Sequence, residues 1–110
     1  MSNVTEMTIN EKTYVIAEVG YDLLDHLNMN DLSIEDLNNS KRRISMVTVF
    51  VSYVLHCGRE QANREITQHI IKGGNLGELV EGMMKALENS RFFTALMKKA
   101  EEEEETAETV

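Results

Sequence analysis

The sequence predicts an all-α fold, a small helical domain of about five helices packed around one buried central helix. Three observations lead to this prediction. None of the 110 residues is a proline, so the composition leaves helices uninterrupted. The segment 41–57 is the most apolar in the chain, and its polar residues recur at helical spacing. On both sides of it, leucines and methionines recur three or four residues apart, as in helices that bury one face.

The central segment 41–57 carries its polar side chains on one narrow stripe: Lys41, Ser45, Thr48, Ser52 and His56. Its many β-branched residues favour a strand. A strand, however, would require polar and apolar residues to alternate, and here they do not. We therefore predict a helix about 25 Å long, at ~1.5 Å per residue, that Ser40 caps and Gly58 ends. Because this helix is apolar around most of its circumference, neighbouring elements must cover it on several sides.

Before the central helix, the sequence leaves one element open. Residues 7–16 place apolar groups on either side of Asn10-Glu11-Lys12, which predicts a short β-hairpin; a helix that runs on from Glu11 is the alternative. Glu11 fits a tight turn poorly, because it resists positive φ. A short amphipathic helix follows over 21–27 and ends at Asn28. Ser33 and Asp36 then resemble a capping pair at the start of a short turn through Leu37.

After the central helix, the sequence predicts three more helices. The first spans 59–72 and ends at Gly73-Gly74. Asn75, with Glu78 three residues later, predicts a capping box at the start of the next helix. Gly77 and Gly82 in that helix permit the close approach of another helix. Asn89-Ser90 marks a break, and a last helix begins near Phe92 and runs into a block of glutamates.

Composition and charge predict one domain over residues 1–100 and a disordered acidic tail over 101–110. The formal net charge is −8, and the tail contributes six of the negative charges. Acidic chains are repelled by phosphate, so we expect neither a nucleic acid nor a membrane surface as partner. The apolar run 44–55 is also shorter than the roughly 20 residues that cross a bilayer. The single cysteine, Cys57, cannot form an internal disulfide and predicts a buried thiol in a cytoplasmic protein.

No residue pattern indicates catalysis, a cofactor or a metal, and we predict a protein that is not an enzyme. The three histidines lack the paired spacing of metal ligands: His26, His56 and His69. Cys57 shows no local signature of a nucleophile. The glycine-rich stretch 73–77 has neither the lysine nor the preceding strand of a phosphate loop, and is interpreted as a turn between helices.

The chain is rich in methionine, with seven residues, and this enrichment bears on its function. Methionines on apolar stripes fill cores, or they line adaptable grooves that bind varied partners. The aromatic pair near the C-terminus allows the same two interpretations, core or exposed anchor. The candidate partner-binding residues are Met46, Phe50, Met83, Met84, Phe92 and Phe93.

The order of these segments resembles the tail assembly chaperones of long-tailed bacteriophages, especially those of Gram-positive hosts. The opening string is Thr8-Ile9-Asn10-Glu11-Lys12-Thr13-Tyr14, and a second string, Gly74-Asn75-Leu76-Gly77-Glu78-Leu79-Val80, starts a later helix. The resemblance covers roughly residues 7–100. Two departures lie in the N-terminal third: members often have Asn-Gly in the opening turn, and an aromatic-rich segment often stands where this chain has 17–20.

The resemblance implies a helical protein that coats the long, apolar tape measure protein before the tail tube assembles around it. Several copies would cover one partner, so a homo-oligomer is implied. The implied location is the host cytoplasm, with the protein absent from the mature virion. The acidic end resembles the family's linker, past which a translational frameshift often adds a second domain. Two alternatives remain open: an acidic helical regulator or inhibitor that binds a basic site on another protein, and a small phage connector or structural subunit.

Overall fold

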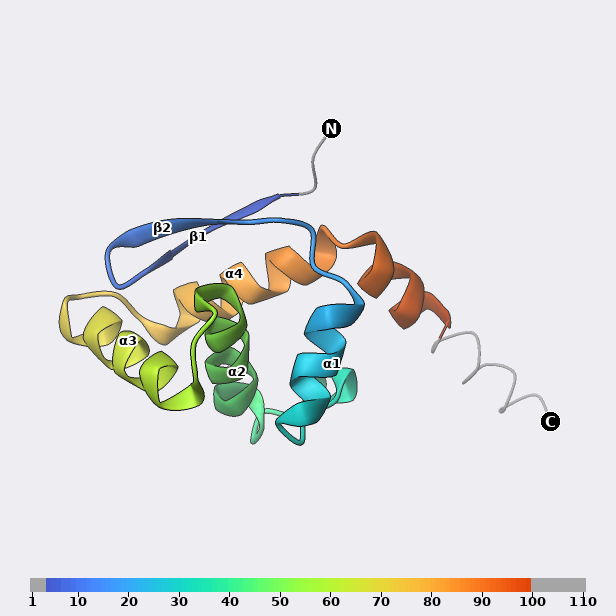
Figure 1. The fold of residues 1–110 in the computed structure, drawn as a ribbon, viewed down its shortest axis with the longest axis horizontal. Helices are drawn as coiled ribbons and strands as arrows, with labels where there is room; N and C mark the ends of the chain where they lie inside the picture. Colours follow the sequence, from blue (N-terminus) through green and yellow to red (C-terminus); the bar gives the residue numbers. More distant parts are fainter. Residues whose placement is uncertain (1–3, 100–110) are drawn as a thin grey trace.

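A computed structural model describes residues 4–99 and shows a mostly helical protein with an N-terminal β-hairpin (Figure 1). Strands β1 (Thr5–Ile9) and β2 (Lys12–Ile16) open the chain. The helices that follow are α1 (Tyr21–Met29), the 3₁₀ helix η1 (Ile34–Asn38), α2 (Arg43–Leu55), α3 (Arg59–Ile71) and α4 (Leu76–Glu88). A last helix covers residues 91–99. The mostly helical fold is confirmed, and the hairpin is the correct alternative for the N-terminal segment.

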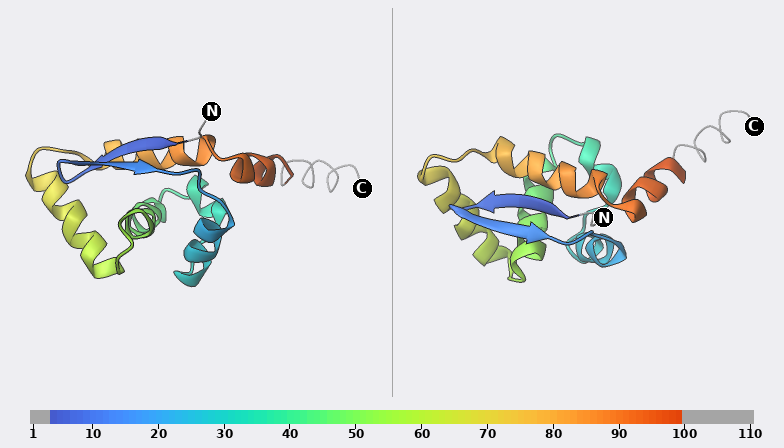
Figure 2. Two further views of the ribbon diagram at one scale, coloured as in Figure 1. Left: turned by 45° about the horizontal axis from the view of Figure 1, so that its top comes forward. Right: turned by 90° about the horizontal axis from the view of Figure 1, so that it is seen from above.

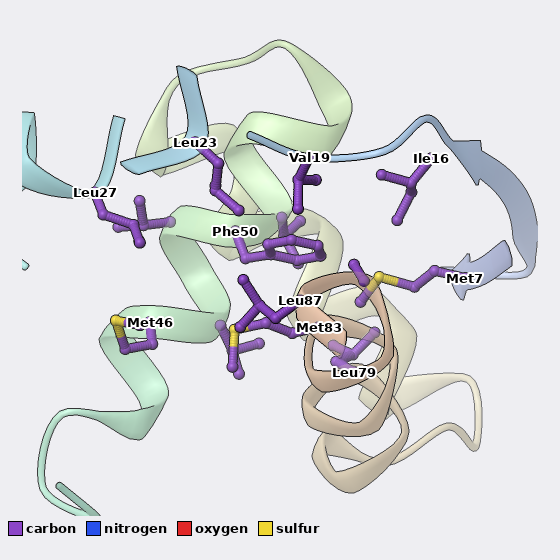
Figure 3. Packing of buried hydrophobic residues seen from close by; sticks show 14 of the residues in the cluster. Met7, Ile16, Val19, Leu23, Leu27, Met46, Phe50, Leu79, Met83 and Leu87 are labelled. Carbon is purple, nitrogen blue, oxygen red and sulfur yellow. The ribbon is translucent and has the colours of Figure 1, made fainter. Parts of the chain in front are cut away.

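The central position predicted for the apolar helix is also confirmed. Helix α2 contacts α1, α3, α4 and η1, and the hairpin lies along α4 on one side of the molecule (Figures 1 and 2). Figure 3 shows Phe50 of α2 at the centre of the core, between Val19 and Leu23 on one side and Met83 and Leu87 on the other. The helix 91–99 continues past α4 and away from the rest of the molecule (Figure 1).

The two strands pair antiparallel, with Ile9 opposite Lys12, so the turn consists of two residues. Both have positive φ, 51° at Asn10 and 69° at Glu11, as a tight two-residue hairpin turn requires. Glu11 therefore adopts the backbone conformation that the sequence argument held against it. One face of β1 is buried, and Met7 of that face packs against Gly82 of α4. A Cβ at Gly82 would lie 2.9 Å from Met7 Cγ. This glycine therefore allows the close approach of strand β1, whereas the sequence predicted the close approach of another helix.

The ends predicted for the central helix are wrong. Residues 39–42 form a turn in which the Arg42 amide donates to the Asn39 carbonyl at 2.9 Å, so Ser40 lies outside the helix and does not cap it. At the other end, His56 takes the left-handed conformation with φ 53°. Gly58, with φ −75°, is the N-cap of α3 instead. The helix is thus shorter at each end than the apolar segment.

The middle of the polar stripe does not face solvent. Thr48 and Ser52 are buried, and each satisfies its hydroxyl within the helix. Thr48 Oγ1 donates to the Ile44 carbonyl at 2.9 Å, and Ser52 Oγ donates to the Val49 carbonyl at 2.7 Å. Because hydroxyls can bond to the preceding turn, a helix can bury them without an external partner.

The predicted turn chemistry around α3 and α4 is confirmed. Gly73, with φ 104°, follows α3 where the chain needs a left-handed residue. At the start of α4, the Glu78 amide donates to Asn75 Oδ1 at 2.9 Å, and the Asn75 amide donates to Glu78 Oε1 at 3.0 Å. At the start of η1, the Ser33 amide likewise donates to Asp36 Oδ2 at 2.9 Å, while the Asp36 amide donates to the Ser33 carbonyl at 3.0 Å. The acidic tail predicted for 101–110 lies outside the described residues.

Candidate partner-binding groove

An apolar groove lies where η1, α4 and the helix 91–99 meet, with a volume of about 390 Å³. We call it the C-terminal groove; it is lined by Leu37, Met84, Leu87, Glu88, Thr94, Met97 and Lys98. Met84 and Leu87 are three residues apart on α4, and Thr94 and Met97 have the same spacing on the last helix. This spacing turns each pair toward one side of its helix, so two helices supply facing walls. One acidic and one basic side chain flank the apolar lining.

The outer wall of the groove is fixed at its start. Ser90 Oγ donates to the Val19 carbonyl at 2.7 Å and accepts from the Phe93 amide at 3.1 Å. The Arg91 guanidinium bonds both carboxylate oxygens of Glu18 at 3.0 Å. Phe93 is 0% exposed, whereas Met97, one turn later, is 43% exposed. The first turn of this helix is therefore anchored in the core, and its next turn presents an apolar side chain to solvent.

The structure separates the six candidate partner-binding residues. Met46, Phe50, Met83 and Phe93 are at most 2% exposed and belong to the core. Phe92 is half-buried and packs edge-on against Tyr21, with ring centroids 6.0 Å apart. Met84 is half-buried and lines the groove. In this conformation, only Met84 of the six takes part in the groove.

Three apolar groove residues were not among the six candidates: Leu37, Leu87 and Met97. Met97 had a usable signal, because it is a methionine on the apolar stripe of the last helix. Leu37 had none, because it comes from η1, which is far from α4 in the sequence, and only the tertiary fold places it there.

Two further hollows border α4. One, of about 540 Å³, shares Glu88, Thr94 and Lys98 with the C-terminal groove and extends it around the start of the last helix. The other, of about 190 Å³, lies between β1 and α4 and is mainly polar. Its lining includes three carboxylates and one amine: Glu6, Glu78, Glu81 and Lys85.

A serine and a histidine lie within hydrogen-bond distance at the joint between α1 and α2. His26 Nε2 is 2.9 Å from Ser52 Oγ. The single hydroxyl proton of Ser52 points at the Val49 carbonyl, so the histidine donates to the serine and does not take its proton. This geometry connects two helices and does not prepare a nucleophile.

The phenol of Tyr53 and the thiol of Cys57 are both held in their neutral forms. Tyr53 donates its hydroxyl to Asp22 Oδ2 at 2.6 Å. Burial raises the pKa of Tyr53, and the hydrogen bond and the negative charge of Asp22 raise it further. Cys57 is only partly buried, and not fully buried as predicted. Partial burial raises the pKa of its thiol, and the charge of Glu65 adds to that effect. A raised pKa disfavours the thiolate, which is the reactive form of cysteine.

Comparisons with protein-family models, with curated proteins and with solved structures gave no match. Within residues 4–99, no group of three or more histidine, cysteine, aspartate or glutamate side chains is placed to hold a metal ion. In the same range, every helix is too short or too polar to cross a membrane.

Proposed function

We propose that this protein is a tail assembly chaperone of a long-tailed bacteriophage, and that it covers apolar helices of the tape measure protein. The C-terminal groove is the observation that supports the proposal most directly. It offers apolar side chains on two facing helices at the surface of a small, mostly helical domain. An amphipathic helix binds in such a groove through side chains three and four residues apart. The strings around Asn10 and Gly74 that resemble the chaperone family add independent support.

The mechanism is reversible burial of apolar surface. Met84 and Met97 face the partner, and methionine side chains repack easily around helices of different sequence. One groove of about 390 Å³ holds only a few side chains, so many copies are required along a long partner. Self-association of the bound copies follows from this arrangement. The chaperone acts in the host cytoplasm, needs no cofactor, and leaves before the mature virion forms.

The proposal requires a neighbouring gene for a long coiled-coil protein, and the test is co-expression with the product of that gene, followed by pull-down. Met97→Glu places a charge in the groove at a side chain that is 43% exposed, so it should fold normally and bind at least about tenfold more weakly. Met29→Glu is the matched control, because Met29 is 76% exposed at the end of α1, outside the groove. Failure of the unaltered chain to bind or solubilise the long protein would refute the function. Equal binding by both variants would refute the groove.

An acidic regulator that binds a basic site is the second candidate function. The hollow between β1 and α4 favours it, because Glu6, Glu78 and Glu81 gather there. Salt separates the two candidates. Binding through the C-terminal groove should persist at high salt, since screening weakens exposed charge pairs and not apolar burial. Binding through the carboxylates should fall steeply as salt rises.

A further inference from the structure

From the contacts of His69, we infer that protonation of this histidine releases the hairpin from α3. We call the contact of Asn10 with His69 and Glu65 the histidine latch. The latch joins the hairpin turn to the last turns of α3. The Asn10 amide donates to His69 Nδ1 at 2.9 Å, and Asn10 Nδ2 donates to Glu65 Oε1 at 3.3 Å. Asn10 is thus bonded to two side chains of α3 that are one helical turn apart.

The first bond fixes the protonation state of the histidine. A backbone amide can only donate, so His69 Nδ1 must be the unprotonated, accepting nitrogen of a neutral ring. A proton on Nδ1 would place two donors against each other at hydrogen-bond distance. The bond from the hairpin would then be lost, and its amide would be left without an acceptor.

The ring cannot turn away to accommodate that proton. His69 is 4% exposed, and a Cβ built on Gly74 would lie only 2.4 Å from His69 Nε2, so the backbone at Gly74 lies directly on the ring. His69 Nε2 and Asn10 Oδ1 are both buried without a hydrogen-bond partner among the described residues. These two unsatisfied groups make the closed latch less stable than a fully bonded contact. A cationic ring in the same place would add the cost of a buried charge.

The groups around the latch include the Glu65 carboxylate, one helical turn before His69, and the negative end of the α3 dipole, and both favour a cationic ring. Glu65 is already bonded to Asn10 Nδ2. Lys72 follows α3, and Glu11 and Lys12 follow Asn10 in the turn, while Gly73 and Gly74 over the ring carry no charge. None of these groups restores an acceptor to the Asn10 amide once His69 Nδ1 carries a proton, so protonation of His69 favours release of the turn.

Release at the turn leaves the other end of the hairpin attached. Asn89 Nδ2 donates to Thr5 Oγ1 at 2.8 Å, which ties the start of β1 to the end of α4. The hairpin can thus lift from its turn end about this attachment. Lifting exposes Met7 and Ile9, which are 4% and 0% exposed when the latch is closed, together with the surface of α4 that they cover.

Hydrogen exchange of the full chain at pH 7.5, 6.5 and 5.5 tests the latch, with rates corrected for the intrinsic effect of pH. Histidine gains its proton in this range. Peptides that span 5–16 should lose protection as pH falls, by up to about tenfold per pH unit for a single linked proton, while peptides of α2 keep theirs. Unchanged protection of the hairpin at pH 5.5 would overturn the inference.

Variants assign the effect to one side chain. His69→Gln keeps an accepting oxygen but cannot gain a proton, so its hairpin should show no loss at pH 5.5. His26→Gln and His56→Asn leave both bonds of the latch in place and should keep the loss seen in the unaltered chain. A loss of equal size in His69→Gln would overturn the assignment.

Ring nitrogen NMR of the unaltered chain gives a readout that needs no variant. His69 should carry its proton on Nε2 at pH 7.5 and become doubly protonated together with the loss of hairpin protection. A doubly protonated ring under a fully protected hairpin, or a hairpin that opens over a neutral ring, would contradict the latch.

Discussion

Val51 lies in the buried middle of the central helix, and its side chain is 0% exposed. We expect Val51→Asp to abolish folding, because it buries an unpaired carboxylate at a cost of several kcal/mol. That cost is comparable with the about 5–15 kcal/mol that stabilise a small domain. Circular dichroism and urea unfolding provide the measurement. A soluble Val51→Asp protein that melts cooperatively would contradict the packing of α2.

Ile44→Asp is the control on the same helix. Ile44 is 66% exposed in the first turn of α2, where an acidic side chain is favourable to the helix dipole. Its free energy of unfolding should stay within about 0.5 kcal/mol of the unaltered protein, as is usual for exposed substitutions.

Position 74 requires a glycine because the ring of His69 packs against it, and not because of its own backbone angles. A methyl group there would overlap the buried ring of His69, so Gly74→Ala should lower the free energy of unfolding by about 1–3 kcal/mol. Gly58→Ala is the matched control, because a Cβ at Gly58 meets nothing within 4 Å, and its loss should be smaller. In His69→Ala, the further change Gly74→Ala should cost less than it does alone. Strictly additive losses in this double-mutant cycle would show that the ring and the glycine are not in contact.

Among the elements, α1 and α2 are joined by a bond that should depend on alkaline pH. The pKa of Tyr53 is raised in the folded protein, so the folded chain holds the phenol proton more strongly than the unfolded chain does. The resulting stability is fully present below the ordinary tyrosine pKa of about 10 and declines as pH rises above it.

Tyr53→Phe should therefore cost roughly 0.5–1.5 kcal/mol at pH 7, toward the lower figure because Asp22 is exposed. Above pH 10, the variant should lose stability less steeply than the unaltered chain. Urea unfolding at pH 7, 10 and 11 compares them, and Tyr14 and Tyr21 are common to both proteins. Parallel pH dependences would mean that the contact with Asp22 contributes nothing.

The elements themselves were largely predictable from the sequence, because their signals are local. The capping box at Asn75 and the left-handed residue at Gly73 depend on residues a few positions apart, and both were predicted. The ends of α2 were mispredicted where tertiary packing overrides local preference. His56 accepts a left-handed backbone without being a glycine, and Glu11 does the same in the hairpin turn.

The candidate site was less predictable, because a helical stripe does not reveal which of its residues reach the surface. Met83 and Met84 are adjacent in the sequence, yet one is 2% exposed in the core and the other lines the groove. The last helix decides which part of α4 stays open, and its direction depends on contacts between residues 18–19 and 90–91. Those partners are separated by more than seventy residues, a distance at which spacing rules give no information.

At the scale of the whole molecule, Phe93 connects the last helix to the rest of the core. It is 0% exposed, so Phe93→Ala should lower the free energy of unfolding by about 3–5 kcal/mol through lost burial and the cavity left behind. Met97→Glu, four residues later, should change it by less than about 0.5 kcal/mol, because the side chain already reaches solvent. Urea unfolding of the two variants measures both values. A loss below about 1 kcal/mol for Phe93→Ala would mean that the helix is not docked through its first turn, and the outer wall of the C-terminal groove would then lack its anchor.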